Sequence, residues 1–454
     1  MSESDIPEPF NVDEVRFRVC FSAPSFEIFV ALVIGWVITV GKHTISQVIL
    51  TMNLHESRHF ASIYRFLAKG RWEADWVSYC LFRLMIEILL AAGAEIRVVL
   101  DDTLSKHCGR KICGAGWQHD GSAPKHSKQK SYGLCFVIIG LAVRLPAMSD
   151  RVFCLPYAAR LWWPPKTKVR PKALPYKKKP ELALELIELT HSWLVEGARL
   201  RVITDLSYCC ETVIKGRSKG VQITGRVRKD SALYELPRVP LLRGQGRPRK
   251  KGHRLPTPAA MFQDPNLPWS KIEAHCYGKK TTLMVYQFTA IWYHTAGNEH
   301  LSFVLCHDPS GTHADSVFFD TDLQLSPEEI VCHYTARCSI EITNRETKQL
   351  LGAAHPQCRR EESVIRAPMF AYWAYSFVVL WFVRQFRTAK HLVGDAPPWY
   401  RQKSHYTFSD MLAAARRSHF SQTFLKEASY DNDLHKNFLA RSTRRQEYTK
   451  CAKL

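Results

Sequence analysis

Five side chains with metal- or phosphate-binding chemistry stand at helical spacing late in the chain: Tyr334, Arg337, Glu341, Arg345 and Lys348. At about 100° per residue, four of them fall within about 60° of one another on one helix face, and Arg345 lies close beside them. Arginine and lysine bind phosphate oxygens, a tyrosine hydroxyl can donate to them, and a carboxylate is a suitable ligand for a divalent cation. The alternative is an exposed face with i,i+4 ion pairs.

The segment that presents these side chains has the start and stop residues of a helix. Ser326 is a favourable N-cap, Pro327 suits the first helical position, and Glu328 and Glu329 favour the positive end of the helix dipole. Gly352 is typical of a helix end. We therefore predict one long helix from Ser326 to Gly352.

Acidic side chains also follow two apolar segments upstream. The β-branched run 94–102 ends in Asp101 and Asp102, and the apolar run 200–205 ends in Asp205. Both runs read as buried strands that deliver carboxylates to their C-terminal ends. Paired strand-end aspartates also occur in α/β proteins without a metal site, so this pair alone does not define one.

The intervening elements predict how these aspartates are brought together. Residues 131–143 and 151–157 read as two further strands, and 181–194 as an amphipathic helix. The order strand, strand, strand, helix, strand is that of a ribonuclease H-like α/β core with a mixed sheet. In that fold the first and fourth strands are neighbours, so Asp101 and Asp205 are expected to lie side by side.

Together these motifs resemble those of the DDE transposases of bacterial insertion sequences. The helix face matches the Y-R-E-K signature of one subgroup, with the gaps Tyr-x2-Arg-x3-Glu-x6-Lys. Asp101-Asp102-Thr103 resembles the first family motif, and Asp205-x2-Tyr208 the second. Cys338 and Asn344 depart from the pattern at positions where relatives often carry aromatic residues.

The resemblance implies a catalytic triad of Asp101, Asp205 and Glu341. It also implies two Mg²⁺ ions per active site, with Mn²⁺ possible in their place. We take Asp101 as the first metal ligand because Thr103 follows it by two positions, and Asp102 stays open as an alternative. Three carboxylates are suitable hard-oxygen ligands for such a metal pair.

The activity implied is metal-dependent DNA strand cleavage and strand transfer at the ends of an insertion sequence. Tyr334, Arg337, Arg345 and Lys348 are then expected to position the DNA. The implied partners are the terminal inverted repeats and the target DNA, with a homodimer in the synaptic complex. The alternative is a catalytically inactive, transposase-derived DNA-binding protein.

Composition agrees with a nucleic-acid partner. The 454 residues include 63 Lys and Arg against 42 Asp and Glu, a formal net charge of +21. The 14 cysteines show no CxxC pair and the first residues are acidic, so we expect reduced thiols in a cytoplasmic protein without a secretory signal. The resemblance implies a bacterial cytoplasm, with the protein on the nucleoid when it is bound to DNA.

Two apolar stretches raise the question of a membrane. The run 26–41 has about fourteen apolar residues between charged neighbours, short of the roughly 20 that a bilayer span needs. The run 367–386 is longer but includes Pro368, two tyrosines and a serine. We predict that both are buried helices and that no membrane is involved.

Two basic, proline-rich loops are predicted to act as extended arms that contact DNA phosphates. They span residues 162–180 and 243–254, although either could instead be a solvated linker. The predicted DNA-binding residues of the second loop are Arg247, Arg249, Lys250 and Lys251.

We predict five segments along the chain. They are a helical N-terminal domain that binds DNA ends (1–95), the first part of the catalytic core (96–215), a β-rich insertion (216–325), the second part of the core with the glutamate helix (326–390), and a basic C-terminal tail (391–454).

Overall fold

The structure is a computed structural model. It describes residues 8–12, 14–121, 123–124, 126, 129–237, 249–393 and 405–428.

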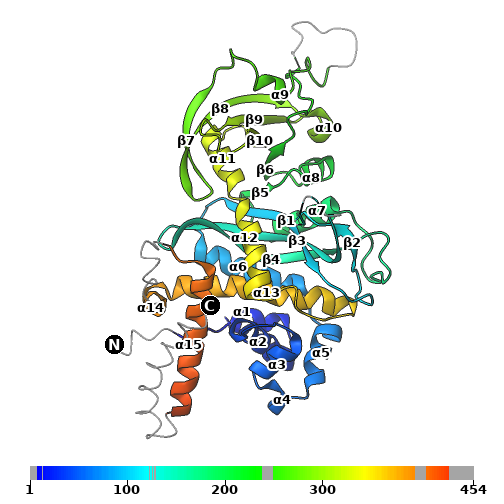
Figure 1. The fold of residues 1–454 in the computed structure, drawn as a ribbon, viewed down its shortest axis with the longest axis vertical. Helices are drawn as coiled ribbons and strands as arrows, with labels where there is room; N and C mark the ends of the chain where they lie inside the picture. Colours follow the sequence, from blue (N-terminus) through cyan, green and yellow to red (C-terminus); the bar gives the residue numbers. More distant parts are fainter. Residues whose placement is uncertain are drawn as a thin grey trace.

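A single mixed sheet runs through the molecule (Figure 1). Its strands follow the order β2-β3-β1-β5-β6-β10-β9-β8-β7. β4 pairs with residues 135–145 of β3, beyond the residues of β3 that pair with β2. The strands are β1 (Ile96–Lys106), β2 (Gly116–His119), β3 (Lys130–Leu145), β4 (Ser149–Trp162), β5 (Leu200–Thr204), β6 (Val221–Val227), β7 (Ser270–Cys276), β8 (Lys279–Ile291), β9 (His300–His307) and β10 (Ser316–Asp320).

Five of these strands confirm the predicted ribonuclease H-like core. Along the sheet they stand in the order β4-β3-β1-β5-β6, which is 3-2-1-4-5 by their order in the chain. β3 is antiparallel to both β1 and β4, whereas β5 is parallel to β1 and to β6. β6 therefore belongs to the core. The prediction had placed this strand in the insertion, because its alternating sequence resembles the strands that follow it.

The predicted β-rich insertion continues the same sheet. β10 pairs antiparallel with β6, and β9, β8 and β7 follow by antiparallel pairing. The insertion thus forms the upper half of the molecule in Figure 1. Short helices lie in its connections and in those of the core: α8 (Glu211–Gly216), α9 (Pro258–Met261) and α10 (Tyr293–Ala296).

The N-terminal segment is helical, as predicted. In Figure 1 most of it lies at the end of the molecule opposite the insertion, and its last helix lies beside β4. Its elements are α1 (Glu14–Phe17), the 3-10 turn η2 (Arg18–Cys20), α2 (Ala23–Ile38), α3 (Ile45–Thr51), α4 (Leu54–Ser57), α5 (Phe60–Lys69) and α6 (Ala74–Leu89).

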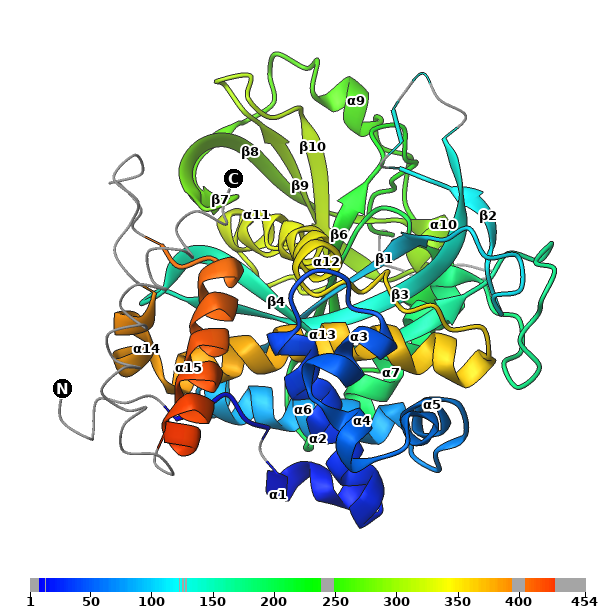
Figure 2. The same ribbon diagram turned by 60° about the horizontal axis from the view of Figure 1, so that its bottom comes forward.

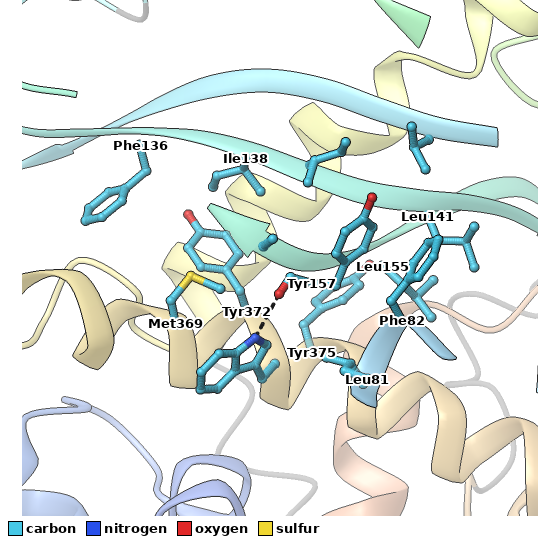
Figure 3. Close-up of a cluster of buried hydrophobic side chains, with 14 of the residues drawn as sticks. Leu81, Phe82, Phe136, Ile138, Leu141, Leu155, Tyr157, Met369, Tyr372 and Tyr375 are labelled. Carbon is cyan, nitrogen blue, oxygen red and sulfur yellow. Dashed lines mark hydrogen bonds between the residues drawn. The ribbon is translucent and has the colours of Figure 1, made fainter. Parts of the chain in front are cut away.

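The long helix α13 (Glu361–Arg384) joins these helices to the sheet. It packs against β4 on one side and against α2 and α5 on another. Tyr372 and Tyr375 lie beside the strand residue Tyr157 in the buried cluster of Figure 3, and Trp373 Nε1 donates to the Tyr157 carbonyl at 2.9 Å. Among the described residues, α13 is the one helix long and apolar enough to cross a membrane, yet 89% of its apolar window is buried inside the protein. It is a core helix, as predicted.

Two more helices follow α13: α14 (Phe386–Leu392) and α15 (Phe408–Ala428). α15 lies against α13 and α2 (Figure 2). Arg416 on α15 donates from Nε to the Val37 carbonyl at 2.7 Å and from Nη2 to the Thr39 carbonyl at 2.8 Å. This part of the predicted tail is therefore a packed helix, and residues 429–454 lie outside the described chain.

The predicted single helix from Ser326 to Gly352 is two helices, α11 (Pro327–Thr335) and α12 (Cys338–Leu350). Ser326 is the N-cap, as predicted, and forms a capping box with Glu329; Gly352 ends the second helix with a φ of +59°. Between the helices the bonds tighten to i→i+3: Arg337 N donates to the Tyr334 carbonyl at 3.0 Å. Tertiary packing explains the break, because α11 packs on the insertion strands and α12 on β4 and β1.

Candidate active site

Asp101 and Asp205 are neighbours in the sheet. The parallel pairing of β1 with β5 ends at Leu100 and Thr204, and each aspartate is the next residue along the chain. The prediction that the first strand stops at Asp102 is wrong, because β1 continues to Lys106 by pairing with β3 alone. The aspartates lie where the parallel pairing of β1 with β5 ends, a position that can accommodate polar side chains.

Asp101 faces α12. Side chains alternate between the two faces of a strand, so Asp101 shares a face with Val99, which packs against Ile340 of α12. Asp101 Oδ2 accepts a hydrogen bond from Arg337 Nη1 at 3.3 Å, and its Oδ1 accepts from the Asp102 backbone N–H at 2.8 Å.

Arg337 bridges Asp101 and Glu341. Its Nη2 lies 2.5 Å from Glu341 Oε1, while its Nη1 contacts Asp101. The Arg337 and Asp101 side chains are 15% and 16% exposed, and that of Glu341 is 53% exposed. The predicted triad thus includes two carboxylates that share one guanidinium at a partly open surface.

The electrostatics of Asp101 reflect its burial. Loss of solvation raises its pKa to about 7, and the nearby Asp205 carboxylate adds to the rise. The Arg337 guanidinium acts in the opposite direction. Asp101 therefore changes charge close to neutral pH, and a further cation at this point would favour its ionised form.

Asp205 is fixed by its own turn. Ser207 donates to both of its carboxylate oxygens, from the backbone nitrogen at 2.9 Å and from Oγ at 3.2 Å. The chain then places Tyr208 in the core, with its hydroxyl directed at Asp102 Oδ1 at 2.8 Å. The second motif therefore connects the Asp205 turn to β1.

Asp102 lies on the opposite face of β1 from Asp101, among side chains that occupy both of its oxygens. Tyr208 donates to Oδ1, and Lys179 Nζ lies 2.6 Å from Oδ2, which also accepts from Cys135 Sγ at 3.4 Å. Lys179, at the start of α7 (Lys179–Ser192), also stacks over the Trp162 ring at 4.9 Å. We did not predict that Lys179 pairs with Asp102. The only indication in the sequence is that Lys179 belongs to the basic run before α7.

The predicted cationic helix face is divided by the break between α11 and α12. The Tyr334 ring is buried, with its centroid 4.5 Å from that of Phe318 in the insertion core. Lys348 Nζ donates to the Leu104 carbonyl at 2.8 Å, and burial lowers the pKa of Lys348. Arg345 is exposed. A contact of these residues with DNA stays a prediction.

The metal prediction fits the donor chemistry but not the present side-chain positions. Within the described residues, no three His, Cys, Asp or Glu side chains converge as a metal-binding group. The candidate ligands Asp101, Asp205 and Glu341 are nevertheless all carboxylates, which suit a hard divalent cation. Two of them already hold a positive group between them, the Arg337 guanidinium.

The first basic loop is not an extended arm. Between β4 and α7, the backbone nitrogens of Lys172, Ala173 and Leu174 all donate to the Glu361 carboxylate, with shortest distances of 2.8, 3.1 and 3.2 Å. Because Glu361 starts α13, the loop is held to the body of the protein.

The second basic loop is described in part. Lys251 Nζ lies over the Tyr234 and Tyr293 rings, at 3.7 and 4.5 Å from their centroids. Arg249 and Lys250 are exposed, and Arg247 lies outside the described residues.

The strand order and the neighbouring aspartates define a class of protein, a ribonuclease H-like fold with acidic side chains where the parallel pairing of β1 with β5 ends. A family model described as DDE superfamily endonuclease matches residues 16–289. The chain belongs to this family. The match includes Asp101 and Asp205, whereas Glu341 lies beyond its end.

Other comparisons are more distant. A search of curated proteins found no match. Among solved structures, the chain is similar to a piggyBac transposase in a cryo-EM synaptic complex with hairpin DNA, at 11% identity and a TM-score of 0.38, covering 96% of this chain and 81% of that one. A TM-score this low does not assign a fold, so the fold assignment rests on the strand order.

Proposed function

We propose that the protein is a DDE transposase, which cleaves DNA strands at the ends of a mobile element and joins them to target DNA with the help of divalent metal ions. The observation that carries the proposal is that Asp101 and Asp205 directly follow the last paired residues of the parallel strands β1 and β5, with Glu341 joined to Asp101 through Arg337. Membership of the DDE superfamily endonuclease family supports DNA cleavage as the reaction.

The residues that would hold the metal are Asp101, Asp205 and Glu341. When bound there, Mg²⁺ or Mn²⁺ would supply the means to activate the attacking water or 3′-hydroxyl and to stabilise the leaving oxygen. The protein's own part is to hold two carboxylates where the parallel pairing of the central strands β1 and β5 ends, and the third on the helix packed against β1. Arg337 and Lys348 supply positive charge beside them for the DNA phosphates.

We assign the first ligand to Asp101 rather than Asp102. Asp101 faces α12, the helix that carries Glu341, and Asp102 points to the other side of β1. Both Asp102 oxygens are engaged on that other side, one by Tyr208 and one by Lys179, whereas the side-chain partner of Asp101 is Arg337, which also contacts Glu341.

The finer features of the proposal rest on sequence. The Tyr-x2-Arg-x3-Glu-x6-Lys spacing favours the Y-R-E-K subgroup of bacterial insertion-sequence transposases, and with it a cytoplasmic protein. The net charge of +21 favours DNA as the partner, through terminal inverted repeats and a target site. A homodimer in the synaptic complex is part of the same proposal.

The alternative is a transposase-derived protein that binds DNA without cutting it. Asn344 favours this alternative, because its buried Oδ1 has no hydrogen-bond partner within the described chain, one turn beyond Glu341. Such a defect would loosen packing near the proposed site.

A cleavage assay separates the two functions. The substrate is a duplex carrying the element's own terminal sequence, with Mg²⁺ or Mn²⁺ added. We expect nicking by the native protein and its loss in D101N, D205N and E341Q. D102N is the matched control, since it alters the neighbouring carboxylate on the opposite face and should retain the metal-dependent reaction in part. Full activity in D101N, D205N or E341Q removes that residue from the site, and no nicking by the native protein supports the alternative.

A further inference from the structure

The Arg337 guanidinium occupies the position between two proposed metal ligands. Nη1 lies 3.3 Å from Asp101 Oδ2, and Nη2 lies 2.5 Å from Glu341 Oε1. The remaining Asp101 oxygen, Oδ1, accepts from the Asp102 backbone N–H. A metal ion that takes both carboxylates as ligands must therefore compete for oxygens that Arg337 holds.

The two carboxylates are the contacts that fix this side chain. Arg337 Nε is buried and has no hydrogen-bond partner in the described part of the chain. The residue sits at the joint between α11 and α12, and the flanking turns are closed by backbone bonds rather than by the guanidinium. Removing the Arg337 head group should thus free Asp101 and Glu341 without unfolding the joint.

We infer that Arg337 is an internal competitor of the divalent cation: in the DNA-free protein its guanidinium neutralises Asp101 and Glu341, and metal binding requires it to leave. The inference rests on the proposed function, which makes these carboxylates metal ligands. A displaced Arg337 stays beside Glu341 on the same helix segment and can pair with a DNA phosphate instead. Metal binding and DNA binding would then favour each other, because each gives the arginine or the carboxylates a new partner.

The test measures metal binding rather than catalysis. Mn²⁺ is titrated into the full-length, DNA-free protein, and free Mn²⁺ is followed by electron paramagnetic resonance. R337Q removes the positive charge and the paired contacts of the guanidinium with Asp101 and Glu341. It should therefore bind Mn²⁺ about tenfold more tightly than the native protein, a factor equivalent to about 1.4 kcal/mol.

A matched variant separates the bridge from simple charge. Arg345 is exposed one helical turn beyond Glu341, so R345Q removes the same charge from the same helix without opening the bridge. We expect R345Q to bind Mn²⁺ within about twofold of the native protein, since exposed charges interact weakly in water. A gain in R345Q as large as that in R337Q overturns the inference.

Two further variants keep the result decisive. R337K retains the charge and the buried stem but offers one nitrogen in place of two, so its affinity should lie between those of the native protein and R337Q. If R337Q has a much lower melting temperature than the native protein, R337K takes its place in the test. D101N should abolish the binding, which shows that the Mn²⁺ is at this site.

The outcomes distinguish the inference from the proposed function. If D101N abolishes Mn²⁺ binding but neither Arg337 variant tightens it, the competition is wrong and the metal site stands. If no Mn²⁺ binding depends on Asp101 in any variant, the inference and the metal-dependent function both fail.

Discussion

The Tyr208–Asp102 hydrogen bond offers a sharp test of how the site is held together. Y208F removes only the hydroxyl, which donates to Asp102 Oδ1 at 2.8 Å. A hydrogen bond to a charged group contributes about 1.5–3 kcal/mol. Asp102 is 25% exposed and keeps Lys179 at 2.6 Å, so we expect a loss near the lower end, about 1.5–2 kcal/mol in the free energy of unfolding.

The chain supplies a matched control for this change. Tyr372 is also buried, but its hydroxyl has no hydrogen-bond partner within the described residues. Y372F deletes the same atom without breaking a bond, so it should leave the free energy of unfolding unchanged or raise it by about 1 kcal/mol. Both variants are compared by urea denaturation, followed by circular dichroism.

The same pair of variants tests whether the bond positions Asp205. Tyr208 lies three residues after Asp205, so loosening it should raise the Mg²⁺ concentration needed for half-maximal cleavage, whereas Y372F should not. The reasoning is refuted if Y208F costs less than about 0.5 kcal/mol, or if the two variants lose equal stability. A loss of stability without a change in the Mg²⁺ requirement would limit Tyr208 to a structural role.

Three further predictions follow from other contacts. Asp320 is fully buried with both oxygens 2.6 Å from Arg201 Nη1, so D320A should cost about 3–5 kcal/mol in urea denaturation, and a cost below 1 kcal/mol would contradict a buried ion pair. Because the folded-state pKa of Asp101 is raised to about 7, ionising Asp101 destabilises the folded protein progressively as pH rises from about 4 to 7. D101N should therefore have a higher melting temperature than the native protein at pH 8, and this difference should shrink toward pH 4. A difference in melting temperature that does not vary with pH would refute the pKa shift. E361A removes the acceptor for three backbone nitrogens of the 163–178 loop, so limited trypsin digestion should cut there faster than in E362A, and equal rates would show that Glu361 does not hold the loop.

Local sequence patterns predicted most of the core. The runs that became β3, β4 and β5 are strongly apolar, and α7 has a clear amphipathic pattern. Their order along the chain was enough to place Asp101 beside Asp205. The capping residues Ser326 and Gly352 were also recognised, because caps depend on a few adjacent residues.

The errors arose where distant contacts decide the structure. The break after Thr335 is set by two different packing surfaces, one on the insertion and one on β4, which the helix's own sequence does not reveal. Likewise, Asp102 meets Lys179 and Tyr208 only in the folded sheet. The Arg337 bridge to Asp101 joins residues 236 positions apart, so spacing on the helix predicted its charge but not its partner.

The continuous sheet has a mechanical consequence for the whole molecule. β10 is bonded to β6 along Val317–Asp320, and Asp320 is clamped by Arg201 of β5. The insertion cannot swing as a separate lobe unless that ladder and that buried ion pair both break. In the proposed function, DNA bound across the insertion would therefore lie at a fixed distance from Asp101 and Asp205.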